Sequence, residues 1–208
     1  GMEALHDAMI KLSRSGEVPL VDAIVHNPDN AILCLGEFTD RAPYTTSYRA
    51  ENIYYKSTLE RTQDYLTTPE YCFRYDTECH WLSRTVPALE WKPVRRLVGR
   101  YFLGSRNLIQ WTKRLEPFFG MKKRPDVVCD VFIPSGRLVE FLHWYASEFR
   151  FFPLWVVPYR VPSMYPWVSA PYAARMSAGM EDDLLIDCAI YGKPNNEPDR
   201  DWSEILER

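Results

Sequence analysis

The stretch VVCDVFIPSGRLVEFLHWYASEF, residues 127–149, decides the fold because it joins the clearest strand pattern of the chain to its clearest helix pattern. Residues 127–133 form an apolar run interrupted by Asp130, which predicts a β-strand. The turn residues 134–136 follow, and Ser135 stands where its side chain can cap the next helix.

Residues 137–149 carry apolar side chains at intervals of three and four positions, which predicts a helix with one apolar face. Five residues make up that face: Leu138, Phe141, Leu142, Tyr145 and Phe149. We therefore expect this helix to be one of those that cover a sheet.

Further strands are predicted on both sides of this stretch. Residues 152–159 and 183–191 are apolar runs of strand length. Upstream, residues 20–26 and 31–38 are separated by Asn-Pro-Asp-Asn, a turn sequence that predicts a β-hairpin. A short amphipathic helix is predicted over residues 3–12.

The remaining segments are less regular. Residues 51–66 mix a possible short strand around 53–55 with a helical continuation. Residues 71–119 are helical in pattern but interrupted by proline and glycine, which predicts several short helices. Residues 161–182 are predicted to form a proline-rich loop.

Together these elements predict an α+β fold, an antiparallel sheet covered on one face by helices, with an irregular helical lobe. We expect an N-terminal helix and linker over residues 1–19, an α+β domain over 20–194, and a polar tail over 195–208.

The composition is that of an ordinary globular protein, with 46% hydrophobic and 25% charged residues. A formal net charge of -3 gives no basic field for phosphates, so nucleic acid is not an expected partner. The five cysteines are widely spaced and suggest neither a metal site nor a disulfide framework, and we expect buried, reduced thiols in a cytoplasmic protein. The sequence contains no apolar run long enough for a transmembrane segment.

Common catalytic signatures are absent from the sequence, including GxGxxG, GxxxxGK[ST], HExxH and GxSxG. The segment FRYDTECHW, residues 73–81, gathers several groups that can exchange protons, although a solvated helix face explains them more simply. Asp130 and Asp187 each interrupt an apolar strand, and from alternation we expect both to face solvent rather than a site. The 14% aromatic content suits either core packing or the walls of a pocket for an apolar ligand.

Three runs in order, VVCDVFIP (127–134), FFPLWVVPY (151–159) and DLLIDCAIYGKP (183–194), resemble the C-terminal region of the 24-dehydrocholesterol reductase family. These Diminuto-type proteins are FAD-dependent oxidoreductases of the vanillyl-alcohol-oxidase class. The runs LGEFTD (35–40), IYYKS (53–57) and RYFLG (100–104) extend the resemblance, which spans about residues 20–194.

The resemblance implies that this chain is the substrate-covering cap of such an enzyme. The FAD-binding domain, in cis or in trans, would then lie outside the chain, so that the chain alone is expected to be inactive and not to bind FAD tightly. The complete protein would exchange a hydride between the flavin and an apolar small-molecule substrate.

Six residues become candidates on this basis. Tyr75 and His80 are candidate proton donors, and the candidate substrate-binding residues are Arg74, Trp155, Tyr159 and Asp187. No metal is expected. The family carries more histidines where this chain has FRYDTECHW, so the resemblance does not imply a sterol substrate.

Two alternatives from other classes stay open. The aromatic-rich chain would also suit a stand-alone module that binds an apolar ligand or a protein partner without redox chemistry. A folded remnant without activity is the other, and the sequence does not rank the two.

Overall fold

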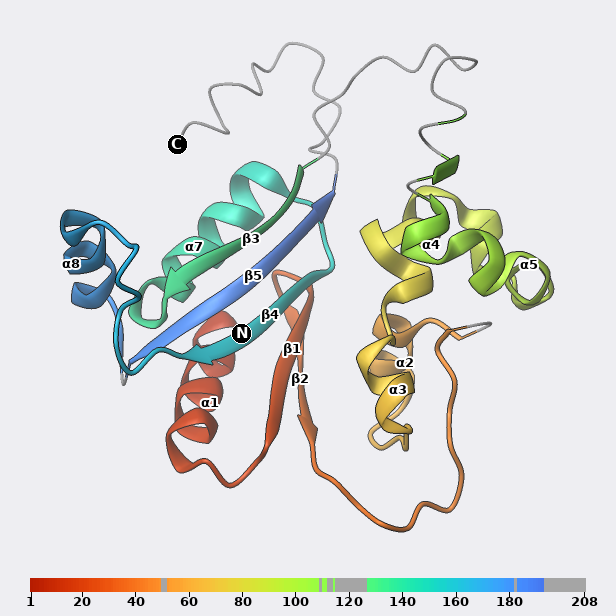
Figure 1. The fold of residues 1–208 in the computed structure, drawn as a ribbon, viewed down its shortest axis with the longest axis horizontal. Helices are drawn as coiled ribbons and strands as arrows, with labels where there is room; N and C mark the ends of the chain where they lie inside the picture. The colour runs from red at the N-terminus through yellow and green to blue at the C-terminus, as the bar shows by residue number, and fades with distance from the viewer. Residues whose placement is uncertain (50–51, 109, 112–113, 115–126, 182, 193–208) are drawn as a thin grey trace. The chain divides into compact units, whose positions relative to one another are not determined.

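The computed structural model describes residues 1–49, 52–108, 110–111, 114, 127–181 and 183–192 (Figure 1). Within these ranges, the side chains of residues 79, 80, 82, 85, 100, 127, 128, 191 and 192 are not described. The chain divides into two compact units. The first unit consists of Gly1–Phe38 and Pro125–Arg208, and the second of Thr39–Arg124.

The first unit is built on a five-stranded antiparallel sheet in the order β2-β1-β4-β5-β3. The strands are β1 (Leu20–Asn27), β2 (Asn30–Gly36), β3 (Val127–Pro134), β4 (Leu154–Arg160) and β5 (Leu184–Gly192). Strand β5 pairs with β3 on one side and β4 on the other, so the last strand in the sequence lies inside the sheet.

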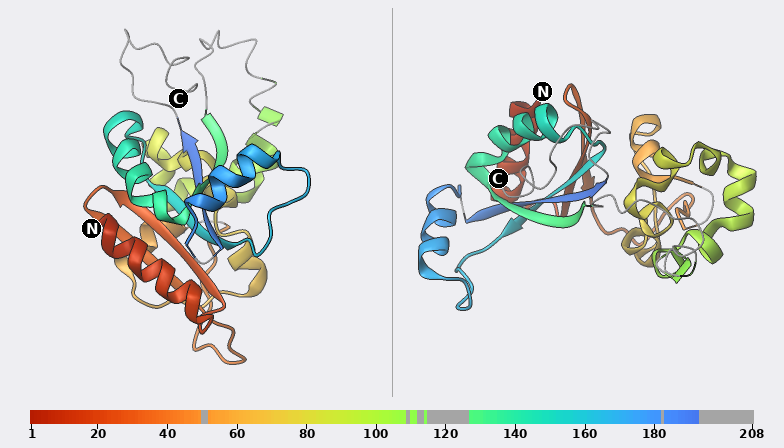
Figure 2. Two further views of the ribbon diagram at one scale, coloured as in Figure 1. Left: turned by 90° about the vertical axis from the view of Figure 1, so that its left-hand side faces the viewer. Right: turned by 90° about the horizontal axis from the view of Figure 1, so that it is seen from above.

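Two helices cover one face of this sheet, α1 (Met2–Ser15) and α7 (Leu138–Trp144), as the view from above shows (Figure 2). The strand residues that point to these helices are almost fully buried: Ala23, Val25, Leu154, Val156, Ile186 and Cys188. Helix α1 adds Leu5, Met9 and Ile10, and α7 adds Leu138 and Leu142. This layer is the hydrophobic core of the first unit.

The opposite face of the sheet is not covered by α1 or α7, and we call it the open face. Because residues directly opposite each other in a ladder point to the same side, the register assigns its members. They are Asp22 and Ile24 on β1, Trp155, Val157 and Tyr159 on β4, Leu185, Asp187 and Ala189 on β5, and Asp130 and Phe132 on β3.

Ser135 does not cap the helix as its position predicted. Its buried hydroxyl accepts a hydrogen bond from the Glu181 backbone N–H at 2.6 Å and donates one to the Glu181 carbonyl at 3.2 Å. The turn between β3 and α7 is thereby tied to the segment that leads into β5. Gly136 N–H donates to the Gly179 carbonyl at 2.9 Å, and a Cβ on Gly136 would come within 2.9 Å of that oxygen. The close backbone approach requires glycine there.

Most elements predicted in the first unit are confirmed: the opening helix, the hairpin, the three later strands and the helix after β3. The last part of that helix is a π-helical turn, η5 (Tyr145–Phe149), and it begins as a 3-10 turn, η4 (Ser135–Arg137). The prediction of a loop between β4 and β5 missed α8 (Ala170–Ala178), which buries none of its residues. The predicted tail lies outside the described residues.

The second unit consists of short helices, as predicted from its prolines. They are α2 (Tyr54–Glu60), α3 (Thr68–Cys72), η1 (Asp76–Trp81), α4 (Leu82–Thr85), η2 (Pro87–Glu90), α5 (Lys92–Val98) and η3 (Gly99–Leu103). The possible strand around residues 53–55 is not formed, because Tyr54 already begins α2. The fold is thus α+β, an antiparallel sheet with helices on one face and an irregular helical lobe.

A buried ion pair forms the centre of the second unit. Arg95 is 0% exposed and its guanidinium donates to the carboxylate of Glu78, which is 2% exposed. The Arg95 side chain also donates to Thr77 Oγ1 at 3.1 Å and to the Leu89 carbonyl at 3.2 Å. Glu78 in turn accepts the Ser83 backbone N–H at 3.1 Å. The network joins η1, α4, η2 and α5, whose shortness leaves little else to fix their packing.

The thiols are less buried than the sequence suggested. Cys188 is buried, whereas Cys72 and Cys129 are exposed and Cys34 is partly exposed, and none of these four is in a disulfide. The expectation of buried thiols was therefore wrong for Cys72 and Cys129.

Glu78→Ala should lower the free energy of unfolding by about 3–5 kcal/mol, because the Arg95 charge would remain buried without its partner. The matched control is Glu90→Ala, which removes a pair with Lys56 at the surface of the same unit and should cost less than about 1 kcal/mol. Urea denaturation of both variants, followed by circular dichroism, measures the difference. Equal losses would show that the buried pair does not hold this unit together.

Candidate functional site

Three of the predicted site residues lie on one surface of the molecule. Trp155, Tyr159 and Asp187 all belong to the open face, on the neighbouring strands β4 and β5. Trp155 stands opposite Ala189, and Asp187 stands opposite Val157, so the tryptophan and the aspartate are diagonal neighbours. The strand register brings these residues together although 32 positions separate Trp155 from Asp187 in the sequence.

The Trp155 ring is held by a carboxylate from the next strand. Its indole N–H donates to Asp22 Oδ2 at 2.7 Å, and Asp22 is only 4% exposed. A charge-assisted bond of this kind fixes the orientation of the ring on the open face. Trp155 can therefore act as a rigid wall for a ligand rather than as a mobile side chain.

Asp187 has a different environment, between apolar partners on both sides. It stands opposite Phe132 on β3 and Val157 on β4, and it is 8% exposed. Its Oδ1 has no hydrogen-bond partner among the described residues. Burial raises the pKa of the Asp187 carboxyl to about 6, and the negative charge of Asp130 adds to the effect. The expectation that Asp187 faces solvent was wrong, whereas Asp130 is exposed as expected.

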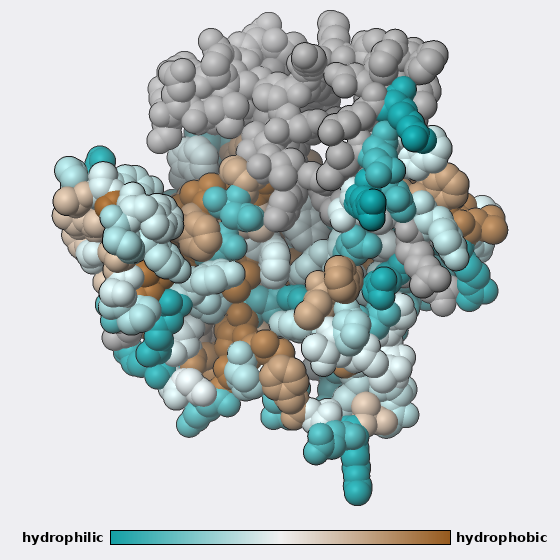
Figure 3. Space-filling model, viewed as in Figure 1, coloured by the Kyte–Doolittle hydropathy of each residue, from teal (hydrophilic) through white to brown (hydrophobic). Residues whose placement is uncertain are grey.

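Two exposed aromatic rings border this carboxyl. Phe132 is 44% and Tyr159 48% exposed, and their rings meet edge to face at 5.5 Å between centroids. Figure 3 views the molecule from the side of the open face, and hydrophobic surface lies over the sheet there between more polar patches. The face thus offers flat apolar contacts beside a carboxyl oxygen that has no partner among the described residues, which suits an apolar ligand with one polar group.

The other candidates belong to the second unit. Arg74 is buried and stands over the rings of Tyr54, Tyr71 and Tyr75 at 5.1, 4.0 and 5.0 Å from their centroids. Its guanidinium also donates to the Tyr71 carbonyl at 2.9 Å. Such cation–π packing stabilises a helical unit that has few long elements.

Tyr75 lies within a chain of edge-to-face aromatic contacts. Its ring meets Tyr54 at 5.3 Å and Trp81 at 5.8 Å between centroids. These contacts fix the position of the ring in the second unit. The side chain of His80 lies outside the described residues.

The sequence did not single out two residues of the open face, Asp22 and Phe132. Both stand at alternating positions of strands, where a polar residue or a large aromatic one is unremarkable by itself. Only the pairing of β1 with β4, and of β3 with β5, shows that they border the predicted residues. Long-range register of this kind is not visible in a single sequence.

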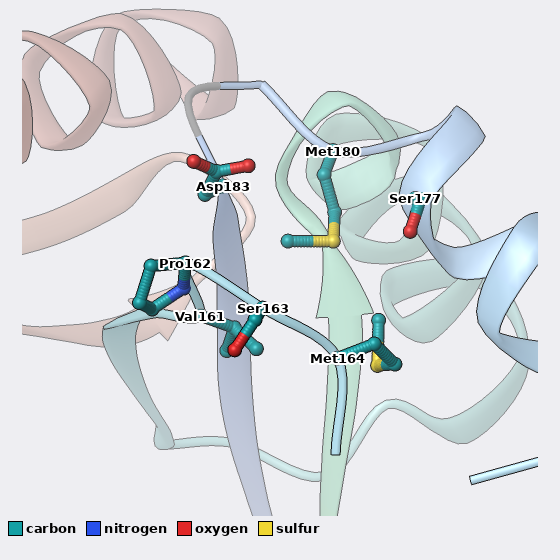
Figure 4. Close-up of a pocket in the computed structure, with 7 residues that line it drawn as sticks. All are labelled: Val161, Pro162, Ser163, Met164, Ser177, Met180 and Asp183. Atoms are coloured by element: carbon teal, nitrogen blue, oxygen red, sulfur yellow. The ribbon is translucent and has the colours of Figure 1, made fainter. Parts of the chain in front are cut away.

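A separate small pocket lies on the connection between β4 and β5 (Figure 4). Its volume is about 210 Å³, and it is lined by Val161, Pro162, Ser163, Met164, Ser177, Met180 and Asp183. It contains none of the predicted site residues. In the described part of the chain, no three His, Cys, Asp or Glu side chains are grouped to hold a metal ion. Nor does that part contain a helix long and apolar enough to cross a bilayer.

Comparison with known proteins finds relatives over almost the whole chain. The human Delta(24)-sterol reductase is 22% identical over 204 aligned residues, which cover 93% of this chain and 38% of the reductase. The chain is distantly similar to Delta(24)-sterol reductase. The reductases of Macaca fascicularis and Mus musculus match over the same shares at 22% and 21% identity.

The chain spans little more than a third of the length of these reductases. No protein-family model matches it, and no solved structure does. The resemblance inferred from the three sequence runs is confirmed at this level of similarity.

Asp187→Asn should stabilise the protein at neutral pH. The native carboxyl, with its pKa near 6, binds its proton more tightly than an unfolded aspartate with a pKa of about 3.9. The free energy of unfolding therefore falls as pH rises from about 4 to about 6, and stays low above that range. The asparagine removes this loss, which the two pKa values set at roughly 3 kcal/mol at pH 7.5 and close to zero at pH 4.

Urea denaturation of parent and variant at the two pH values measures this difference. Asp130→Asn is the control: it keeps Asp187 but removes the neighbouring charge, and should weaken the pH dependence without abolishing it. A variant Asp187→Asn that is less stable than the parent at pH 7.5 would contradict the assignment.

Proposed function

We propose that this chain is the substrate-covering cap of an FAD-dependent oxidoreductase, in which an apolar substrate lies against the open face. The observation that carries the proposal is the similarity to Delta(24)-sterol reductase along 93% of the chain. The domain predicted over residues 20–194 would make up this cap, with the sheet supplying the substrate wall.

The geometry of the open face supports this role. Trp155 is fixed by Asp22, Tyr159 is half exposed against Phe132, and Asp187 carries a free carboxyl oxygen. Flat aromatic rings contribute binding through burial of apolar area, and one polar group supplies orientation. Trp155, Tyr159 and Asp187 are therefore our proposed substrate contacts, and Arg74 is kept as a further one.

FAD itself would be held mainly by a domain other than this cap. The sequence has nine glycines and no glycine-rich turn of the type that lets a backbone approach a pyrophosphate. The residues described here do not fit the phosphate half of the cofactor. We propose that a flavin-binding domain, in cis or in trans, holds FAD and that the cap supplies substrate orientation and water exclusion. When bound, the flavin would supply hydride transfer.

Tyr75 and His80 stay candidate proton donors. In the assembled enzyme, Tyr75→Phe keeps the ring contacts with Tyr54 and Trp81 but removes the phenolic proton. If Tyr75 donates a proton in the reaction, this variant should lower kcat by a factor of about 100 or more at unchanged KM. Unchanged kcat would remove Tyr75 from the mechanism, and His80→Asn tests the other candidate in the same way.

The alternative is a stand-alone module that binds an apolar ligand or a protein partner without redox chemistry. The same exposed rings of Phe132 and Tyr159 favour it, because they need no flavin to bind an apolar molecule. The two functions differ in whether flavin joins the complex.

A flavin titration distinguishes them. FAD absorbance and fluorescence are followed with this chain alone, then with a flavin-binding domain encoded beside it. We expect no binding by the chain alone and a change of the flavin spectrum when both parts are present. No change in either case, with a folded chain that binds an apolar dye, would favour the stand-alone module.

A matched pair of variants tests the open face in the same assembly. Tyr159→Ala removes a half-exposed ring from the open face and should raise the substrate KM about tenfold, because a large apolar contact is lost. Tyr172→Ala removes an equally exposed ring from α8 and should leave KM within about twofold. Equal effects of the two variants would contradict a substrate wall on the open face.

A further inference from the structure

We propose that Asp187 and Asp130 form an acid pair on the open face, in which Asp187 holds a proton and presents it to the ligand bound there. The inference deepens the proposed function, on which it rests for the identity of the reaction. The pairing itself follows from the geometry of β3 and β5.

The register makes the two carboxyls neighbours. Asp130 stands opposite Ala189, and Asp187 stands opposite Phe132, so the two aspartates are diagonal partners on the same face of an antiparallel pair. Diagonal side chains of this kind are close enough to interact, with Cα atoms roughly 7–8 Å apart. The two sites differ in solvation, because Asp187 is 8% exposed whereas Asp130 is exposed to water.

This difference decides where the proton resides. An exposed carboxyl ionises readily because water solvates its charge, whereas a buried one beside that charge keeps its proton. When the environments of two neighbouring acids drive their pKa values apart, the acid with the higher pKa is the one assigned as proton donor. Asp187 is then the member of the pair that holds the proton.

The other titratable groups that the structure describes on or beside this face lie on β1, β2 and β4. On β4 the face carries Tyr159, on β1 Asp22 and on β2 Cys34, and His26 follows on β1 where the register with β2 shifts. Burial lowers the pKa of His26, which favours its neutral form. Among the described residues of β3, β4 and β5, no lysine or arginine lies on the open face to stabilise an ionised Asp187.

Two other aspartates show what a structural carboxylate looks like in this protein. Asp22 accepts the Trp155 indole N–H, and Asp64 accepts the Thr46 hydroxyl at 2.6 Å and the Tyr65 N–H at 2.9 Å. Asp187 is also buried, at 8% exposed against 4% for Asp22, but its Oδ1 meets no donor among the described residues. A buried polar atom without a partner costs stability, which argues that a ligand completes this site.

The proton transfer is balanced without a further reactant. The O–H bond of Asp187 breaks as a bond forms between that proton and an atom of the ligand, and Asp187 is left as a carboxylate. In the proposed reduction this proton would accompany the hydride that the bound flavin supplies. Water at the exposed Asp130 offers a route by which Asp187 regains its proton.

A hydrophobic carbodiimide tests the proposal on the chain as it exists. Dicyclohexylcarbodiimide reacts with protonated carboxyls, whose proton moves to a reagent nitrogen while the carboxyl oxygen bonds to the central carbon. Peptide mass spectrometry then locates the adduct. We expect Asp187 to be modified several-fold faster at pH 6 than at pH 8.5, and faster than Asp22 at either pH.

The variant Asp130→Asn supplies the decisive comparison. Without the neighbouring charge, Asp187 should lose its proton at lower pH, and its modification at pH 7 should slow several-fold. Asp187→Asn should remove the adduct, and circular dichroism confirms that both variants are folded. Failure of Asp187 to react faster than Asp22, or an unchanged rate in Asp130→Asn, would overturn the acid pair.

The two proposals fail separately. Suppose that the carbodiimide modifies Asp187 as expected, but flavin binds neither to the chain alone nor to the chain with a flavin-binding domain. The acid pair is then supported and the proposed oxidoreductase function is contradicted. If flavin binds with the partner domain but Asp187 is unreactive, the cap stands and its proton comes from another group.

Discussion

The antiparallel pairing of β5 between β3 and β4 is the constraint on which the first unit depends. It fixes which residues of the last strand face the core and which reach the open face. A shift of one residue would place Ile186 and Cys188 on the open face and turn Asp187 into a core packed by α1 and α7. Such a shift would leave a carboxyl among fully apolar neighbours, so the position of Asp187 itself helps to select the register.

The second unit depends on a different kind of interaction. Its helices are short and cannot bury long apolar stripes, and the Glu78 and Arg95 network supplies the links between them. Aromatic rings add a second set of contacts, from Tyr48 and Tyr54 through Tyr75 to Trp81. Arg74 and Tyr75 belong to this packing, which shows how a segment rich in proton-exchanging groups can serve structure as well.

Much of the fold could be predicted from sequence because its signals are local. Apolar runs of strand length mark β3 and β5, and three- and four-residue spacing marks α7. Helix α8 was missed because the prolines before it suggested a loop and because it has no apolar face to bury. Ser135 was assigned to the nearest helix by position, whereas its bonds reach 46 residues along the chain to Glu181. Asp22 and Phe132 were not predicted either, because only long-range strand pairing makes them part of the site.

Asp187 shows why burial and hydrogen bonding have to be considered together. A carboxyl in an apolar strand can be a solvated residue, a satisfied structural group or a reactive one, and the sequence pattern is the same for all three. Asp130 is exposed, Asp22 accepts the Trp155 indole N–H, and both lie on the same face as Asp187. What separates Asp187 is that it is buried between strand positions held by Phe132 and Val157, while its Oδ1 meets no donor among the described residues. Among the described residues, the two strands that flank β5 thus also create the environment that raises the pKa of the Asp187 carboxyl.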